Sequence, residues 1–195
     1  MRKTIIAITT AFVALSGTPA VSEPDSGVSS TDLEAARALT KKFAKSLKGE
    51  LQAAIAEGGP ENAISVCRMV APGIAGQIST ESGWAVGRTA LKVRNPRNAP
   101  SVRERAVLMS FLARQENGES LAGMESAAVI REGERDYLHY MKAIPTGGLC
   151  LTCHGSNVAP NVRAAIQETY PADAATGFRK GELRGAFTLV KPVNR

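Results

Sequence analysis

Cys150, Cys153 and His154 stand within five consecutive positions of the chain, in the run "CLTCH". Two thiols at this spacing can form thioether bonds to the two vinyl groups on one edge of a porphyrin, and an imidazole directly after them can reach the iron. The pattern C-x-x-C-H is the attachment motif of c-type haem. It predicts one covalent haem c attached to Cys150 and Cys153, with His154 as the proximal iron ligand.

The same residues allow two other chemistries, and a structural disulfide or unused thiols would be the plain alternative. A thioredoxin-like dithiol also uses C-x-x-C, but it stands at the entry of a helix in a strand-helix unit, whereas Gly147, Gly148 and Gly155 favour a loop here. A structural zinc site would need a fourth ligand, usually from a second clustered pair, and the sequence has none. A dithiol oxidoreductase stays open as an outside alternative, and zinc is weaker still.

The position opposite His154 on such an iron would be filled by water or by another side chain. His139, in the run "RDYLHYMKA", shares one face of an expected strand with Tyr137 and Met141, where a histidine is more often a packing residue. Thioether sulfurs are also candidates, although methionines more often fill the core. They belong to Met69, Met109, Met124 and Met141.

Cys67 is the third cysteine of the chain. Three cysteines cannot all pair with one another in an oxidising compartment, so one remains as a free thiol or has another use. Cys67 lies on the apolar face of an expected helix, where a flat cofactor could rest. From these observations alone, an iron ligand and a buried inert cysteine are about equally well supported.

The chain begins with the features of a secretory signal peptide. Arg2 and Lys3 precede a short apolar run and then small residues, and cleavage after Ala20 or after Ser22 fits equally well. The apolar run is too short for a permanent bilayer span. We therefore expect a signal peptide over residues 1–22 and a mature protein in the periplasm.

Length and composition predict one domain of ordinary size. Apolar residues make up 44% of the 195 residues, and aromatic residues only 5%. The formal charge of +6 falls to +4 without Arg2 and Lys3, and the basic residues are not gathered with aromatics into a nucleic-acid-binding stripe. A mild positive charge could steer the protein toward an anionic redox partner or membrane surface. No residue pattern indicates a hydrolase, a nucleotide site or a membrane span.

Hydrophobic periodicity and capping residues predict two long helices in the first half of the chain. A capping box at Thr31 and Glu34 opens an amphipathic helix that ends at Gly58. A second helix begins at Pro60, carries the third cysteine on its apolar face, and bends near Pro72.

Strands follow the helices, which favours an α+β domain with an antiparallel sheet. Residues 23–30 are expected to be a flexible lead-in, and residues 31–195 a single haem-binding domain. The first strand runs from Trp84 to Asn95. The other expected elements are a helix over 101–114, a hairpin of strands over 127–131 and 135–143, a helix over 161–169 and a strand over 184–190.

Four ordered blocks of the sequence are similar to one known family. The blocks are "ENAISVCRMVAPGIA", "GWAVGRTALKVRNPRNAP", "IPTGGLCLTCHGS" and "YPADAATGFRKGELRGAF", and they span most of residues 31–191. Together they closely resemble a family of exported single-haem c-type cytochromes, catalogued as a domain of unknown function, whose structural type is a cyanobacterial cytochrome. The resemblance implies a PAS-like α+β fold and an iron held between a helix cysteine and the motif histidine, here Cys67 and His154.

This resemblance leads us to expect a periplasmic c-type monohaem protein that passes single electrons to a redox partner protein. Its haem would have a low potential, because a thiolate ligand favours the ferric state. The alternative is a haem-based redox or gas sensor, in which Cys67 leaves the ferrous iron, a small gas binds, and a signalling protein responds. Enzymatic activity is not expected.

Four further residues are candidate haem contacts. Arg88, Lys92 and Arg94 could pair with the propionates, although charged residues on a strand usually form a solvated face. Trp84 could pack on the porphyrin, with packing in the core of the sheet as the favoured alternative.

Overall fold

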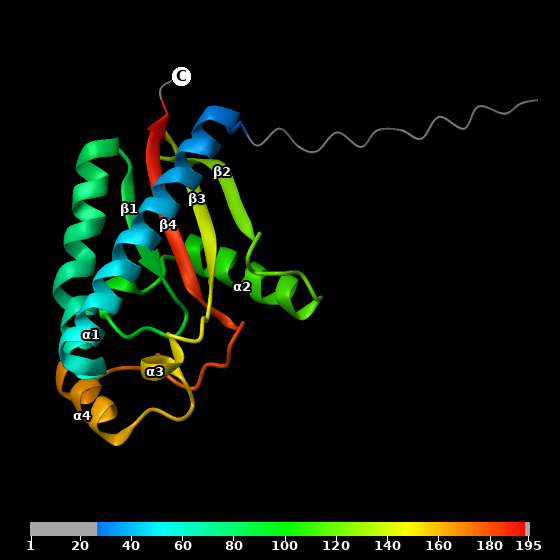
Figure 1. Ribbon diagram of the computed structural model, residues 1–195. Helices are drawn as coiled ribbons and strands as arrows, with labels where there is room; N and C mark the ends of the chain where they lie inside the picture. The colour runs from blue at the N-terminus through cyan, green and yellow to red at the C-terminus, as the bar shows by residue number, and fades with distance from the viewer. Residues whose placement is uncertain (1–26, 194–195) are drawn as a thin grey trace, which may run out of the picture.

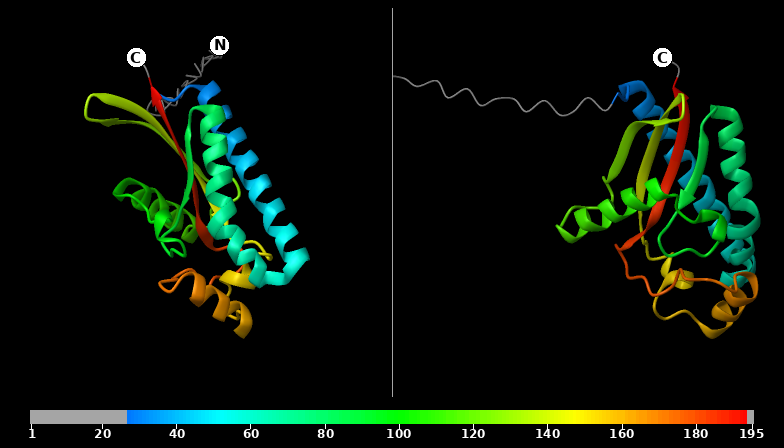
Figure 2. Two further views of the ribbon diagram at one scale, coloured as in Figure 1. Left: turned by 90° about the vertical axis from the view of Figure 1, so that its left-hand side faces the viewer. Right: turned by 180° about the vertical axis from the view of Figure 1, so that it is seen from behind.

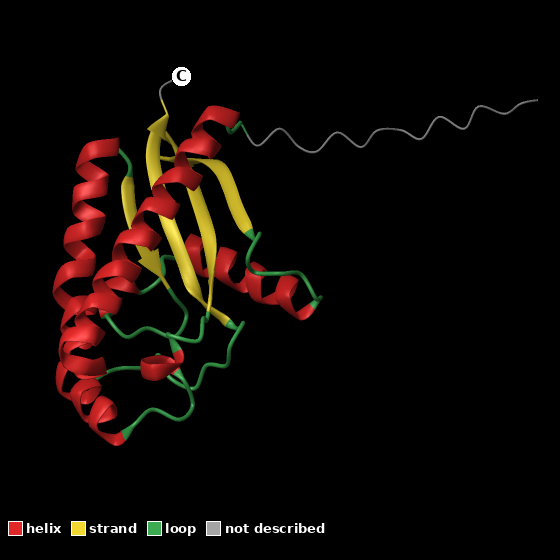
Figure 3. Ribbon diagram, viewed as in Figure 1, coloured by secondary structure: helices red, strands yellow, loops and turns green. Residues whose placement is uncertain are grey.

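The computed structural model describes residues 27–193 and contains a four-stranded antiparallel sheet with helices against both faces (Figures 2 and 3). The expected signal peptide over residues 1–22 and the first part of the lead-in lie outside the described residues. From one edge to the other, the strands are β1 (Ala85–Thr89), β4 (Leu183–Val193), β3 (Arg135–Pro145) and β2 (Glu125–Glu132). The predicted α+β class is confirmed.

Helix α1, Ser30–Ser82, is a hairpin of two antiparallel helices that covers one face of the sheet (Figure 1). Within this element the backbone is non-helical only at Gly58 and Gly59. Gly59 has a φ of 76°, in the left-handed region that favours glycine. The two predicted helices are therefore confirmed, and the chain passes through Pro72 without a break.

The start of α1 differs from the prediction. Ser29 is the N-cap, because its hydroxyl accepts a hydrogen bond of 3.0 Å from the backbone N–H of Asp32. The predicted capping box at Thr31 and Glu34 is wrong by two residues. Ser29 also has an acidic residue three positions later, Asp32, which lies in the first turn of the helix.

Strand β1 is shorter than predicted. After Thr89, the backbone N–H of Ala90 donates to the C=O of Asn98 (3.3 Å), so the chain turns back instead of following β4. Lys92 and Arg94 consequently lie in a loop and not on a strand. This loop brings both cations toward the end of the sheet where β3 ends and β4 begins.

The remaining elements lie close to their predicted positions, apart from two short helices, η1 and α3, which the sequence did not predict. Ser101 and Glu104 form the expected capping box through reciprocal hydrogen bonds. The turn α3, which the glycines around it did not predict, contains part of the C-x-x-C-H motif. These elements are η1 (Pro96–Asn98), α2 (Val102–Glu116), α3 (Leu151–His154) and α4 (Pro160–Thr169).

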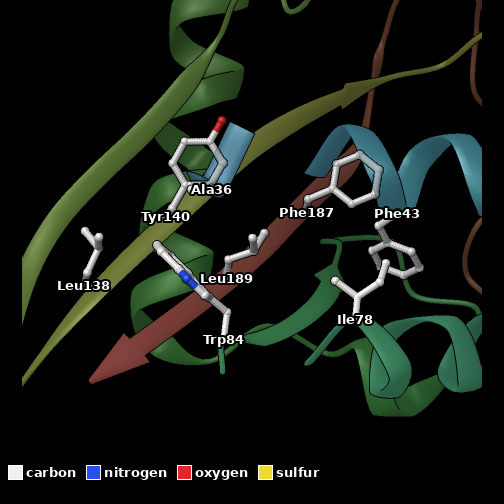
Figure 4. Close-up of a cluster of buried hydrophobic side chains, with 8 residues drawn as sticks. All are labelled: Ala36, Phe43, Ile78, Trp84, Leu138, Tyr140, Phe187 and Leu189. Atoms are coloured by element: carbon white, nitrogen blue, oxygen red, sulfur yellow. The ribbon is translucent and has the colours of Figure 1, made fainter. Parts of the chain in front are cut away.

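Side chains of β3 and β4 point alternately to the two faces of the sheet and form two cores. The core against α1 contains Ala36, Phe43, Ile78, Trp84, Leu138, Tyr140, Phe187 and Leu189 (Figure 4). The core against α2 contains Leu108, Phe111, Leu121, Met124, Met141, Ala143, Leu183 and Ala186. No helix within residues 27–193 has the length and apolar content needed to cross a membrane.

Candidate functional site

The C-x-x-C-H motif lies beyond one end of the sheet, beside the bend of α1 and next to α4 (Figure 1). Strand β3 ends at Pro145 and delivers the chain directly into it. Cys150 precedes α3, and the backbone N–H of His154 donates to the Cys150 C=O (2.9 Å), which closes one helical turn. A Cβ on Gly155 would lie 2.6 Å from the Leu151 carbonyl oxygen, so only glycine fits there. This turn places both thiols and the imidazole on one short, fixed segment.

His154 has one nitrogen fixed and the other free. Its Nδ1 donates to the Ala175 carbonyl (2.6 Å), and the edge of Phe178 packs against the ring at 6.3 Å. Among residues 27–193, Nε2 has no hydrogen-bond partner. Burial, with the positive charges of Arg184 and Arg94, lowers the pKa of His154 to about 2. The imidazole is therefore neutral, with its Nε2 lone pair available, which is what a metal ligand requires.

Arg94 holds this segment in place. The side chain is 8% exposed and forms a bidentate pair with Asp173, with Nε to Oδ1 at 3.1 Å and Nη2 to Oδ2 at 3.0 Å. Its Nη2 also donates to the Cys153 carbonyl (2.6 Å), and Asp173 Oδ1 accepts from the Ala175 N–H (2.9 Å). Arg94 therefore ties the backbone of the motif to the segment whose carbonyl orients His154. Its Nε and Nη2 are committed to these contacts, which makes Arg94 a positioning residue.

Arg88 and Arg184 are different, because neither has a carboxylate within ion-pair distance among the described residues. Arg88 lies 5.7 Å from the centroid of the Phe43 ring, and Arg184 lies 5.2 Å from that of Phe178. Burial lowers the pKa of Arg88, and burial with the neighbouring arginines lowers the pKa of Arg184 to about 10. Both side chains are half-buried, and the hydrogen bond that Arg184 makes is to the Lys92 carbonyl (3.2 Å) and not to a carboxylate. Half-buried cations without a paired carboxylate indicate a binding place for negative groups.

Arg184 was missed by the sequence analysis. It lies at the start of β4, and its approach to Phe178 depends on the loop that precedes the strand. Lys92, a predicted contact, lies on the same side: its Nζ donates to the Thr176 carbonyl (3.1 Å) and lies 5.0 Å from the Phe178 ring centroid. Trp84 lies elsewhere, in the core against α1. This placement does not support Trp84 as a cofactor contact and agrees with the core alternative.

The second helix of α1 brings Cys67 to the motif. Its thiol is half-buried and unpaired, as are those of Cys150 and Cys153. Burial raises the pKa of the Cys153 thiol, and the nearby Cys67 raises it further, which places the two thiols in one electrostatic environment. Cys67 also opposes the lowering of the pKa of Arg88. One turn before Cys67, Ile64 packs with α4 in a cluster against which Cys153 lies.

His139 lies on the opposite face of the sheet. Its Nδ1 accepts from Arg103 Nε (3.0 Å), and its Nε2 bonds to Thr188 Oγ1 (3.0 Å), so both nitrogens are engaged. Met124 and Met141 are buried in the core against α2, and Met69 and Met109 are exposed. The structure therefore supports none of these candidates as the ligand opposite His154.

The structure also disfavours the rival chemistries of the motif. A nucleophilic dithiol needs a lowered thiol pKa, whereas burial raises the pKa of Cys153. The sheet is antiparallel throughout, so no thioredoxin-like strand-helix unit surrounds the cysteines. Residues 27–193 hold no cluster of three or more His, Cys, Asp or Glu side chains that could bind a bare metal ion.

Comparison with known proteins gives one family and one solved structure. The model of the Tll0287-like family matches residues 22–192. The crystal structure of the cyanobacterial haem protein Tll0287 is 28% identical in sequence and superposes with a TM-score of 0.61, covering 86% of this chain and 99% of that chain. No curated protein matches the chain significantly. Because the family model covers nearly all of the sequence, this chain belongs to the Tll0287-like family.

Proposed function

We propose that this protein binds one haem c covalently through Cys150 and Cys153, with His154 and Cys67 as axial ligands, and acts as an exported one-electron carrier. The observation that carries the proposal is the free Nε2 of a neutral His154, which lies beside two unpaired thiols while Ala175 holds Nδ1. When bound, the haem supplies a one-electron iron couple. The likeness to a cyanobacterial haem protein supports the same reading.

His154 would be held as a ligand by its own neighbours. Because the Ala175 carbonyl accepts the Nδ1 proton, the tautomer and the ring orientation are set before any ligand arrives. The bond from Arg94 to the Cys153 carbonyl keeps this turn aligned with the segment that contains Ala175. The imidazole is thus already ordered in the folded protein. Ligation then costs little further conformational entropy, which favours tight binding.

Cys67 would supply the opposite ligand as a thiolate. Ligation requires loss of the Sγ proton, which is released when the thiol binds the metal. A thiolate donates negative charge to the iron and lowers its reduction potential. We therefore assign this protein to the low-potential carriers, working in the periplasm if the expected signal peptide is used.

Arg88 and Arg184 would pair with the two propionates. Both cations are half-buried and lack a carboxylate within ion-pair distance among residues 27–193, so each would gain a charge-assisted pair. Arg94, which already pairs with Asp173, would contribute through position alone. Lys92 lies at the rim of this group, over Phe178.

The test is expression with export in a host that attaches c-type haem. Mass spectrometry should show the mass of one haem added to the mature chain, and acid-acetone extraction should leave the colour on the protein. Cys67→Ala should change the ferric spectrum and raise the midpoint potential by on the order of 100 mV. Met69→Ala is the matched control, because Met69 is a nearby sulfur that is 71% exposed. A chain without the added mass of haem would contradict covalent attachment. A Cys67→Ala spectrum equal to that of wild type would contradict Cys67 as the ligand opposite His154.

A further inference from the structure

A cavity lies under the first helix of α1, away from the C-x-x-C-H motif. Its volume is about 490 Å³, within the range of small-molecule sites. None of the cysteines and neither histidine lines it. The polar residues that line it are Arg37, Thr40, Lys41, Glu125, Tyr140 and Lys142. The cavity is therefore a separate place in the molecule with its own chemistry.

The charges of this cavity are not balanced. Arg37 donates to both oxygens of Glu125, at 3.3 Å or less, and the Tyr140 hydroxyl donates to Oε2 of Glu125 at 2.8 Å. Lys142 Nζ lies farther from Glu125, at 3.8 Å, and Lys41 makes no ion pair among the described residues. The cavity lining therefore contains three cationic side chains and one carboxylate, Glu125. Arg37 makes most of the hydrogen bonds to that carboxylate. The remaining positive charge favours an anionic occupant.

Thr40 adds a polar group without a partner. The residue is 7% exposed, and its Oγ1 is buried with no hydrogen-bond partner among residues 27–193. A helical threonine ordinarily bonds the carbonyl one turn earlier, and a buried hydroxyl without a bond costs free energy. Here the hydroxyl belongs to a residue that lines the cavity. Because this oxygen is buried, an acceptor inside the cavity would reach it after the Thr40 side chain rotates about χ1.

The rest of the lining is apolar. Ala44, Ala143 and the ring of Phe187 close the cavity beside the charged groups. Phe187 is 8% exposed and is held by edge contact with Phe43 at 5.6 Å between ring centroids. Positive groups beside a fixed apolar wall suit a molecule that has both a carboxylate and a hydrocarbon body.

We propose that this cavity binds a small organic carboxylate. The carboxylate would lie between Lys41 and Lys142, the Thr40 hydroxyl would turn to donate a hydrogen bond to it, and the hydrocarbon body would lie against Phe187. The proposal does not rest on haem attachment, because the cavity and the motif share no lining residue. It adds a recognition role that electron transfer alone does not need. An inorganic anion would use the charges but leave the apolar wall uncovered.

Calorimetric titration of the mature, haem-loaded protein tests the proposal. The probes are sodium benzoate, sodium succinate and sodium pyruvate, with sodium chloride and sodium sulfate at equal ionic strength as controls. We expect at least one carboxylate to bind at least tenfold more tightly than sulfate. If sulfate binds as well as every carboxylate, or if none of the three carboxylates binds, the proposal is overturned.

Substitutions then assign the binding to this cavity. Lys142→Gln and Lys41→Gln should each weaken the bound carboxylate at least fivefold, while Lys48→Gln, an exposed lysine of the same helix outside the lining, should leave affinity unchanged. Thr40→Val keeps the shape and removes the hydroxyl, so it should weaken binding while making the unliganded protein no less stable. Unchanged affinity in both lysine variants and in Thr40→Val would place the binding elsewhere and overturn the proposal.

Discussion

The two histidines of this chain lie in different parts of the structure and differ in one property. His154 is in the turn beyond the sheet, and His139 is in strand β3 on the face toward α2. Burial is the largest cause of a lowered pKa in both, so both imidazoles are neutral near pH 7. His139 uses both nitrogens in hydrogen bonds, whereas His154 uses only Nδ1. A spare nitrogen, and not burial or charge state, distinguishes the candidate ligand.

Two buried or half-buried arginines repeat this contrast. Arg94 donates hydrogen bonds to Asp173 and to the backbone of the motif, whereas the Nε of Arg103 donates to His139. Arg94 bonds to the backbone around His154 and not to its imidazole, so the imidazole remains free to bind a ligand. Arg103 instead donates directly to a ring nitrogen of His139. The same side-chain type supports a binding histidine in one region and a packing histidine in the other.

Replacement of the two histidines is expected to have the largest effect. His154→Gln removes the free imidazole, so the exported protein should lose the low-spin ferric spectrum even where the thioethers form. His139→Gln should leave that spectrum unchanged, since both nitrogens of His139 are engaged away from the motif. Optical and electron paramagnetic resonance spectra of the two purified variants measure this. A His139→Gln spectrum as altered as that of His154→Gln would break the comparison.

Replacement of the arginines should give the next largest effect. Arg94→Ala leaves Asp173 as a buried carboxylate without its partner, at a cost of about 3–5 kcal/mol in the free energy of unfolding. Arg103→Ala removes one hydrogen bond from His139 and should cost about 1 kcal/mol. Urea denaturation of both variants provides the values. Equal decreases in the free energy of unfolding would mean that the Arg94–Asp173 ion pair stabilises the protein no more than the single hydrogen bond from Arg103.

Much of this contrast could be predicted from local sequence, but its decisive contacts could not. C-x-x-C-H is a contiguous motif, so Cys150, Cys153 and His154 could be identified as candidate site residues without knowledge of the fold. The helix periodicity placed Cys67 on an apolar face, and only the family resemblance gave it a role. The partner of His154, by contrast, is the backbone carbonyl of Ala175, and any residue type can supply a carbonyl.

The secondary structure was predictable where it is determined by neighbouring residues in the sequence. It was less predictable where it depends on which strands pair. The capping box at Ser101 and the glycine bend of α1 were found because neighbouring residues determine them. The early end of β1 depends on a hydrogen bond from Ala90 to Asn98, which no periodicity encodes. Arg184 was missed for a related reason: its place near the motif follows from the path of β4 and the loop before it.

The acid stability of the protein should report on His139. Burial and the neighbouring Arg103 hold its pKa below the usual value of 6.5, while Glu104 and Glu132 oppose this shift. Between the lowered pKa and 6.5 the unfolded chain binds more protons, so the free energy of unfolding should fall as the pH falls through this window. Urea titrations at pH 7.5 and pH 5.5 should show a smaller loss in His139→Gln than in wild type. An equal loss in both proteins would show that His139 carries none of this dependence.

A surface ion pair should show the smallest effect and thereby separate burial from pairing. Lys42 Nζ lies 2.6 Å from Glu81 Oε2, and their side chains are 53% and 46% exposed, against 8% and 5% for Arg94 and Asp173. Water and salt screen an exposed pair, so Lys42→Gln should leave the urea midpoint within experimental error of wild type. If Lys42→Gln destabilises the protein as much as Arg94→Ala, the effect of Arg94 would come from pairing alone. Desolvation of Asp173 would then no longer explain why the motif is held so firmly.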